Sequence, residues 1–367
     1  MLRSLELHRR HVQERRELSR WVGSLFLGGA ICGAAVVLTE CTDGGSDEEG
    51  RSPRGGDLVP AKPTATPDAE SSADALPASP LDAGSGHDAA PPGVLRTLAT
   101  GESHPRAIAV AGGFAYFTVY EGAALRRVSV DGGAVNTVVA NFEDALAVTV
   151  DDEFVYAATT HPHGIVIRQP LDGGPIDTLA SDEVYPTALV VSGGTAYFTT
   201  SSAVKSVPIT GGAISVVASS VAGPNGIAVA GGTVFFTVYN DGTIRAASGG
   251  TVSIIVSGQS YPSGIVVANG RVVFTCTGDG TVKSALPDGG DLRTLTSGWS
   301  YPVAILADGP WLYFTAAGGD IVRVRGDGTD LTVLATKEKG PEGLAVDATS
   351  VYWVTHPAGE VRSLTPK

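Results

Sequence analysis

The sequence predicts an all-β fold built from seven similar four-stranded sheets. The chain has 367 residues, of which 48 are glycine and 22 are proline, so glycine is about twice as frequent as in an average protein. From Gly93 onward a similar pattern of strands and turns returns about every 39 residues, a period typical of repeat architectures. Each repeat pairs a short apolar strand with a second strand that has an aromatic centre. A helical bundle or coiled coil would be richer in Leu, Glu and Lys.

An uncharged segment precedes the repeats. Residues 21–39 carry no charge, and six arginines lie in residues 1–20. A helix of this length spans about 28 Å, close to the hydrocarbon thickness of a bilayer. The excess of arginine before it predicts a cytoplasmic region at 1–20, a transmembrane anchor or signal segment at 21–39, and export of the rest. We therefore expect a cell-envelope protein held at a bacterial membrane, with its folded domain outside the cytoplasm.

Three fates remain open for this segment. An uncleaved anchor is the favoured interpretation, and a cleaved signal peptide is the second. The third is a lipoprotein, because Cys41 and the acidic tether after it resemble a bacterial lipoprotein start. Glu40 departs from that pattern, which has a small residue before the cysteine.

A Pro/Ala/Ser-rich stretch follows at residues 42–93. It contains eight prolines, many acidic residues and few bulky apolar side chains. Such a composition cannot bury enough apolar surface to offset the entropy of ordering the chain. We expect a disordered, acidic linker that holds the domain away from the membrane.

Residues 94–367 predict a seven-bladed β-propeller of four-stranded antiparallel blades. Asp-Gly and Gly-Gly pairs separate the strands and supply the positive φ that two-residue hairpins need. Both faces of the strands are apolar, as expected when each sheet packs between two neighbours. A two-sheet sandwich would not explain seven equal periods.

The ends of the repeat array predict how the ring closes. The array opens with a lone fourth strand at Val94–Ala99 and finishes with a third strand at Glu360–Leu364. The strand at 94–99 should therefore complete the last blade and cover an edge that would otherwise be open to aggregation.

The units have the form P-x-G-[IL]-x-V, then [VA]-[YF]-[FW]-T, then D-G. This pattern resembles the YWTD and NHL repeats of extracellular and bacterial β-propellers over residues 94–367. Seven units with a Phe-Thr strand are also similar to the virginiamycin B lyase family, which is an enzyme family. The chain departs from YWTD domains in having seven units rather than six and no Asp after the Thr.

One rim of the predicted propeller gathers the aromatic and imidazole side chains. In a propeller the loops from fourth to first strand share a rim with the turns from second to third strand, and such loops often carry binding residues. The candidate binding residues on this rim are His104, Tyr120, His161, His163, Tyr185, Tyr261, Trp299, Tyr301 and His356.

These residues also have structural interpretations. Each X-Pro pair before a first strand could simply fix an extended backbone, and each Tyr could be filler between blades. His161 and His163 could be half of a metal site, but few acidic residues accompany them. We predict no metal ligands, no cofactor and no catalytic residues, since the sequence lacks a nucleophile motif, a phosphate-binding loop and paired acids at a telling spacing.

Three functions follow for the exported domain. The favoured one is a binding module for a protein, peptide or glycan, contacting its partner through the His/Tyr rim. The second follows from the lyase resemblance, which implies a metal-dependent lyase or lactone hydrolase with His356 or His161 as general base. The third is a passive envelope scaffold. Nucleic acid is not an expected partner, because the net charge is −13 and the basic residues are scattered.

Overall fold

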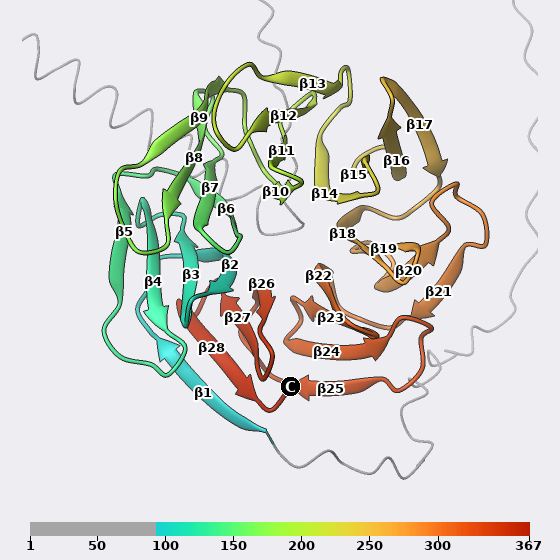
Figure 1. The fold of residues 1–367 in the computed structure, drawn as a ribbon. Coiled ribbons are helices and arrows are strands. Elements are labelled where there is room, and N and C mark those ends of the chain that lie inside the picture. The colour runs from blue at the N-terminus through green and yellow to red at the C-terminus, as the bar shows by residue number, and fades with distance from the viewer. Residues whose placement is uncertain (1–92) are drawn as a thin grey trace, which may run out of the picture. The chain divides into compact units, whose positions relative to one another are not determined.

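Seven blades surround one axis. The computed structural model describes residues 93–367, and their 28 strands form seven four-stranded antiparallel sheets arranged in a ring (Figure 1). The predicted seven-bladed propeller is confirmed. The expected cytoplasmic region (1–20), membrane segment (21–39) and, apart from Gly93, linker (42–93) lie outside the described residues. Within residues 93–367 no helix is long and apolar enough to cross a membrane.

The first four blades follow the chain in order, each from the inner to the outer strand. The first contains β2 (Pro105–Ala111), β3 (Phe114–Val119), β4 (Ala124–Ser129) and β5 (Asn136–Ala140). The second contains β6 (Ala145–Val150), β7 (Phe154–Thr159), β8 (Gly164–Pro170) and β9 (Asp177–Glu183). The third contains β10 (Leu189–Ser192), β11 (Thr195–Thr199), β12 (Val204–Pro208) and β13 (Ser215–Ala218). The fourth contains β14 (Pro224–Ala230), β15 (Thr233–Val238), β16 (Thr243–Ser248) and β17 (Thr251–Val256).

Two further blades repeat this order and the last one differs. The fifth contains β18 (Pro262–Ala268), β19 (Arg271–Cys276), β20 (Thr281–Ala285) and β21 (Arg293–Thr296). The sixth contains β22 (Pro302–Asp308), β23 (Trp311–Ala316), β24 (Asp320–Arg325) and β25 (Thr332–Ala335). The seventh contains β26 (Pro341–Val346), β27 (Val351–Thr355), β28 (Glu360–Thr365) and, as its outer strand, β1 (Val94–Ala99).

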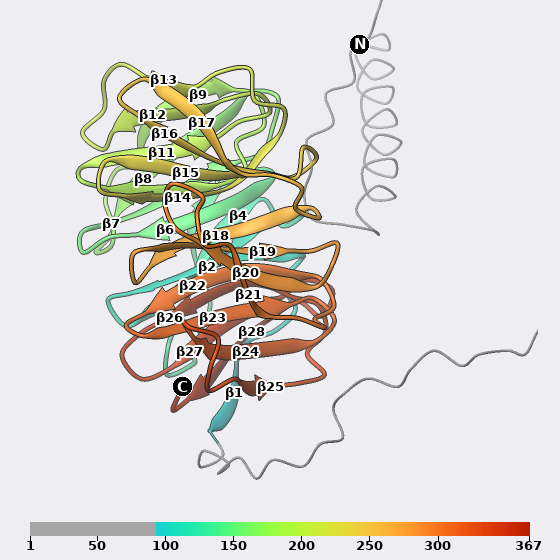
Figure 2. The same ribbon diagram turned by 90° about the vertical axis from the view of Figure 1, so that its right-hand side faces the viewer.

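The ring closes through β1. This strand pairs antiparallel with β28, from Val94 opposite Thr365 to Ala99 opposite Val361, and the two lie side by side (Figure 1 and Figure 2). Leu98 and Ala99 are buried in a cluster that contains residues of the first and seventh blades. The predicted closing strand is therefore confirmed, and it joins the two ends of the array through both backbone pairing and apolar packing.

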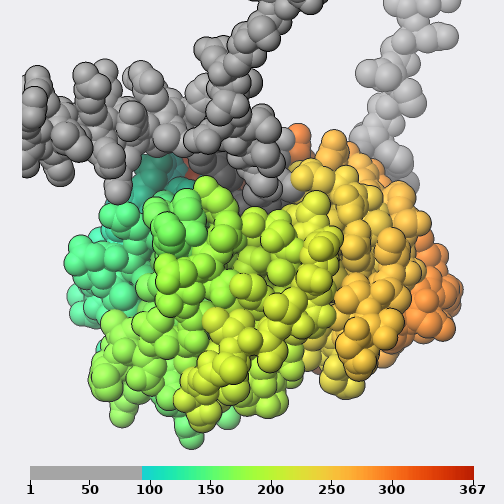
Figure 3. Space-filling model, turned by 90° about the horizontal axis from the view of Figure 1, so that it is seen from above, coloured from blue at the N-terminus to red at the C-terminus, as the bar shows by residue number. Residues whose placement is uncertain are grey.

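The apolar core lies in the seams between blades. Phe274 of the fifth blade packs with Phe235 and Ile244 of the fourth, and Phe198 of the third packs with Tyr156 of the second. The space-filling view shows neighbouring blades packed together in the green-to-orange part of the chain (Figure 3). The aromatic centre of each second strand is thus explained, because it must fill the space on both sides of its sheet.

A threonine hydroxyl links successive blades. The inner strand carries a bulge in every blade but the third, and in the fourth blade the bulge falls between Pro224 and Ile227. The Thr237 hydroxyl accepts a hydrogen bond from Gly226 N–H (2.8 Å) at the bulge and donates to the Ser263 carbonyl of the next blade (2.7 Å). Equivalent hydroxyls bridge the neighbouring seams, at Thr199, Thr275 and Thr315. The Thr that ends the Phe-Thr motif is therefore a connector between blades.

Glycine at the bulge lets the inner strands approach closely. A Cβ on Gly226 would lie 2.3 Å from the Ser263 carbonyl oxygen, and one on Gly264 would lie 2.4 Å from that of Val303. Real Cβ atoms do not come so near to backbone oxygen, so the hydroxyl bridge and the glycine belong to the same close contact between blades.

Deletion of residues 94–99 should destabilise the domain severely. The deletion exposes β28 as an open edge and removes Leu98 and Ala99 from the closing seam. We expect the melting temperature to fall by more than about 10 °C, since 1 kcal/mol shifts a domain of this size by about 2–4 °C. As a matched pair, Leu98→Ser replaces a buried side chain and Leu95→Ser replaces an exposed one. Leu98→Ser should therefore lower the melting temperature more than Leu95→Ser does. Equal melting of the deletion variant and the full chain would disprove closure through β1.

Substitution of Thr237 by Val should weaken the seam between the fourth and fifth blades. Thr237 is fully buried, so Val leaves Gly226 N–H and the Ser263 carbonyl without partners, a loss of about 1–3 kcal/mol. Urea unfolding measures the change. Thr237→Ser keeps the hydroxyl and should retain more of the stability, whereas a Val variant as stable as the wild type would show that the bridge contributes nothing.

Candidate functional site

The candidate residues lie on the rim formed by the loops into the first strands and the turns after the second strands. His104, Tyr185, Tyr261 and Tyr301 each stand just before a Pro, at the end of a loop from an outer strand to an inner strand. Tyr120, His161, His163 and His356 lie in turns between second and third strands. The antiparallel order of every blade brings these two kinds of loop to the same end of the ring.

Backbone hydrogen bonds fix the rim loops in six of the seven seams. The N–H of the third residue before each inner strand donates to a turn carbonyl of the preceding blade, as in Gln259 to Gly242 (2.9 Å) and Glu102 to Gly359 (3.0 Å). The same pattern joins Phe142 to Ala123, Val221 to Ser202, Trp299 to Gly280 and Glu338 to Gly319. The second blade differs, since its turn carbonyl at His161 accepts from Tyr185 instead.

The last residue of each rim loop is left-handed; it stands directly before the inner strand in six blades and directly before Pro186 in the third. Its φ is positive in all seven blades, at His104, Asp144, Tyr185, Gly223, Tyr261, Tyr301 and Gly340. The expectation that X-Pro fixes an extended backbone here is therefore wrong. The conformation aims the carbonyl of this residue at its own blade, where it accepts from the turn after the second strand, as Tyr301 does from Ala317 N–H (2.9 Å).

Three rim tyrosines occupy this left-handed position with their side chains exposed. Tyr185, Tyr261 and Tyr301 have φ values of 52°, 51° and 53° and relative exposures of 39%, 49% and 47%. Exposure of this size does not fit filler between blades. Tyr261 also packs on Tyr239 of the neighbouring blade at 4.9 Å between ring centroids. The left-handed conformation disfavours any residue with a Cβ, and glycine takes its place in two blades.

A second group of side chains meets where the first and seventh blades join. Arg106 of β2 donates two hydrogen bonds to Glu342 of β26, at 2.7 and 2.9 Å. The rings of His104 and His356 stack with centroids 4.5 Å apart, and His356 Nδ1 lies 3.9 Å from Glu342 Oε1. The guanidinium carbon of Arg106 lies over the Tyr120 ring, 5.5 Å from the ring centroid. We call these residues (His104, Arg106, Tyr120, Glu342 and His356) the seam cluster.

Burial sets the protonation of this cluster. It lowers the pKa of His356, and the neighbouring Arg106 and His104 lower it further. Burial raises the pKa of Glu342, although Arg106 opposes the rise. It also raises the pKa of Tyr120 to about 12, with Asp144 adding to the effect. At neutral pH His356 is therefore an uncharged imidazole beside Glu342, which accepts two hydrogen bonds from Arg106.

His104 also has an acidic neighbour. Its Nδ1 lies 2.8 Å from Glu121 Oε2 in a turn of its own blade, in a direction that does not make a hydrogen bond. Glu121 is well exposed, so water weakens this contact.

The remaining candidate residues do not join the two groups. His163 is 76% exposed at its side chain and lies 3.4 Å from the equally exposed Asp182, and His161 stands next to it with ring centroids 6.4 Å apart. Trp299 turns inward, packs edge-on against Phe314 and donates to the Thr296 hydroxyl, so it belongs to the blade core. In the described part of the chain no three His, Cys, Asp or Glu side chains are placed to share a metal ion.

Sequence reasoning missed the charged partners on this rim. Arg106 and Glu342 each follow the Pro of an inner strand. This shared position was the sequence signal that could have predicted their pairing. Three buried glutamates stand three residues before the inner-strand Pro and pair with cations of a third strand. They are Glu102 with Arg126, Glu183 with Lys205 and Glu338 with Arg362. An alignment of the repeats on the Pro would have revealed this position.

Comparison with known proteins identifies the fold and nothing finer. No protein-family model and no curated protein matches the chain. A solved streptogramin B lyase has 16% identity and a TM-score of 0.65, covering 75% of this chain and 98% of its own. Hydrazine synthase from Kuenenia stuttgartiensis has 15% identity and a TM-score of 0.61, covering 72% and 96%. The designed protein Ika8 has 16% identity and a TM-score of 0.55, covering 73% and 98%. Identities this low establish a shared propeller fold, which supports many unrelated functions.

Proposed function

We propose that the chain is a binding module of the cell envelope, anchored through residues 21–39, which holds a protein, peptide or glycan on its His/Tyr rim. The propeller fold is compatible with an interaction module, because it presents many loops on a rigid frame. The anchor and the outward location rest on the arginines before residues 21–39 and on the linker composition.

The three exposed tyrosines carry this proposal. They occupy a left-handed position that Gly223 and Gly340 fill in other blades, so the fold requires only the backbone there. A residue with an aromatic side chain has a strained backbone in that conformation, and such strain is concentrated at functional sites. Aromatic rings supply large contact area at low entropic cost.

The placement of the tyrosines indicates an extended partner. Tyr185, Tyr261 and Tyr301 come from the third, fifth and sixth blades, so a ligand that touches all three must span several blades. Polar side chains of the inner strands lie between them, with Asn225 and Ser263 close enough for a weak hydrogen bond (3.5 Å). A chain-like partner such as a peptide or glycan fits this arrangement.

A second candidate function, catalysis at the seam cluster, is favoured by the meeting of imidazole and carboxylate groups there. Burial, with smaller effects of Arg106 and His104, lowers the pKa of His356 to about 3, whereas general bases work best with a pKa near the working pH. Glu342 is held by both of its hydrogen bonds to Arg106. Binding therefore fits the rim better than proton transfer does.

The lyase resemblance also implies a divalent metal, and the residues do not fit one. In residues 93–367 no suitable group of three ligands is present. The two imidazoles of the seam cluster stack on one another, and the carboxylate of the cluster is engaged by a guanidinium. We derive no metal-dependent step from this site.

Replacement of Tyr185, Tyr261 and Tyr301 together by Gly should abolish binding without loss of stability. Glycine removes the rings and relaxes the left-handed backbone, so the variant should melt within a few degrees of the wild type. Ligands of the full chain are first selected on glycan and peptide arrays. We expect their affinity for the triple variant to fall at least tenfold.

Asn269→Gly is the matched control for this experiment. Asn269 is also left-handed, with φ 51°, but it lies in the turn between β18 and β19 on the opposite rim. It should leave affinity unchanged. If the selected ligands bind the triple variant as well as the wild type, the tyrosines are not the binding surface.

Replacement of His356 by Gln should make the domain more resistant to acid. The pKa of His356 is near 3 in the folded chain and about 6.5 when unfolded. The unfolded chain therefore binds the extra proton first, and stability falls as the pH drops from 6.5 towards 3. At pH 5 the loss should be about 2 kcal/mol in the wild type and absent in the variant.

Urea unfolding at pH 7 and pH 5 measures this difference. His163→Gln, at an exposed imidazole, is the control and should behave as the wild type does. An identical acid-induced loss in wild type and His356→Gln would mean that His356 is not held neutral by its surroundings.

A further inference from the structure

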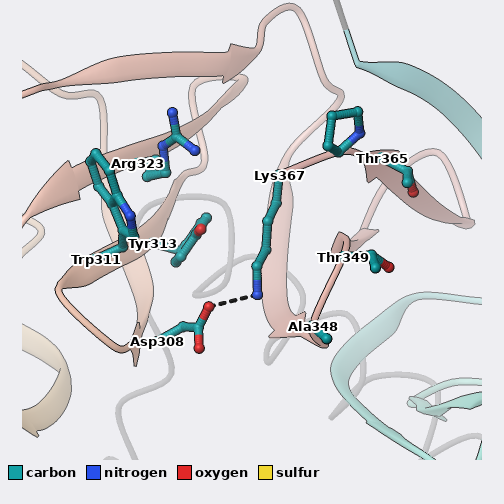
Figure 4. Close-up of a pocket in the computed structure, with 9 residues that line it drawn as sticks. Asp308, Trp311, Tyr313, Arg323, Ala348, Thr349, Thr365 and Lys367 are labelled. Carbon is teal, nitrogen blue, oxygen red and sulfur yellow. Dashed lines mark hydrogen bonds and ion pairs between the residues drawn. The ribbon is translucent and has the colours of Figure 1, made fainter. Parts of the chain in front are cut away.

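A separate pocket opens on the opposite rim, between the sixth and seventh blades. It has a volume of about 410 Å³. Trp311, Tyr313 and Arg323 line one side, and Ala348, Thr349 and Lys367 line the other (Figure 4). A volume of this size suits a small organic molecule.

Arg323 lines this pocket, and no carboxylate in residues 93–367 forms an ion pair with it. Its guanidinium stacks on Trp311 at 4.4 Å and contacts the Tyr313 hydroxyl. Its buried Nε–H has no hydrogen-bond acceptor among the described residues. The two neighbouring cations are neutralised instead, because Lys367 pairs with Asp308 (2.6 Å) and Arg325 with Asp330.

The corresponding arginines of two other blades have the partners that Arg323 lacks. In the first blade Arg127, opposite Tyr116, stacks on Phe114 and donates to the Leu171 carbonyl at 3.0 Å. In the second blade Arg168, opposite Tyr156, stacks on Phe154 and pairs with Asp177 at 2.9 Å. Arg323 stands opposite Tyr313 in the same register.

The acceptor of Arg127 has a structural match in the seventh blade. Leu171, which serves Arg127, follows the third strand of the next blade and donates its N–H to the Glu153 carbonyl (2.9 Å). Lys367 follows the third strand of the seventh blade and donates its N–H to the Thr349 carbonyl (3.0 Å) in the same way. The Nε–H of Arg323 nevertheless has no acceptor among residues 93–367.

We propose that this pocket binds a small organic carboxylate with a flat apolar body. A carboxylate matches the guanidinium fork and would supply a charged acceptor for Arg323. The apolar body would lie between Tyr313 and Pro366, and the Thr349 and Thr365 hydroxyls at the wall can serve polar substituents. This site is independent of the His/Tyr rim.

Benzoate tests the proposal on the full chain. Calorimetry and saturation-transfer NMR should show saturable binding, and benzamide, with the same shape but no charge, should bind at least tenfold more weakly. Arg323→Gln should weaken benzoate binding at least tenfold. Absence of saturable benzoate binding, or equal binding of benzoate and benzamide, overturns the proposal.

Two further variants separate the pocket from general effects. Ala348→Phe fills the pocket from an exposed turn while keeping Arg323, and it should block benzoate. Arg127→Gln removes the matched guanidinium of the first blade, and it should leave benzoate affinity unchanged. Undiminished binding to Ala348→Phe, or an equal loss in Arg127→Gln, would place benzoate elsewhere and refute the site.

Discussion

In four of its seven seams the propeller depends on a hydrogen-bond bridge in which one threonine hydroxyl serves two neighbouring inner strands. Thr237 illustrates it, since its hydroxyl accepts from the bulge of its own blade and donates to the next. The bridge sets the distance between neighbouring inner strands. It therefore also sets the distance between the side chains that follow each Pro and line the axis. A glycine at the bulge, such as Gly226, makes this distance sterically feasible. The angular spacing of the blades thus has a local, polar cause in addition to apolar packing.

On the rim, the fold requires a particular backbone conformation but no particular side chain. The seven left-handed residues are held by backbone hydrogen bonds, and glycine serves as well as tyrosine for that purpose. Side chains at these positions are therefore free to differ between blades without disturbing the ring. The presence of Tyr261 and Tyr301, in spite of the conformational cost, is the observation on which the proposed partner contact rests.

Much of the fold could be predicted because it follows from local, repeated patterns. Seven periods, the hairpin glycines and the lone strand at 94–99 all have direct sequence signals. The extended X-Pro was wrong because hydrogen bonds across the rim, which no single repeat reveals, select the left-handed conformation. The pairing of Arg106 with Glu342 joins residues 236 positions apart and becomes visible only when the ring is closed. Trp299 looked like a rim residue because its loop is on the rim, but its ring turns into the blade.

The seam cluster and the Arg323 pocket both border the closing blade. Val354 of the seventh blade, like Ala158 of the second, stands where four other blades have the bridging Thr. An ion pair between Arg106 and Glu342 joins the inner strand of the seventh blade to that of the first. A buried ion pair contributes less net stability than its short distances suggest. The closing seam thus has charged groups where four other seams have a hydroxyl bridge, and charged groups beside open space are suited to recognise a ligand.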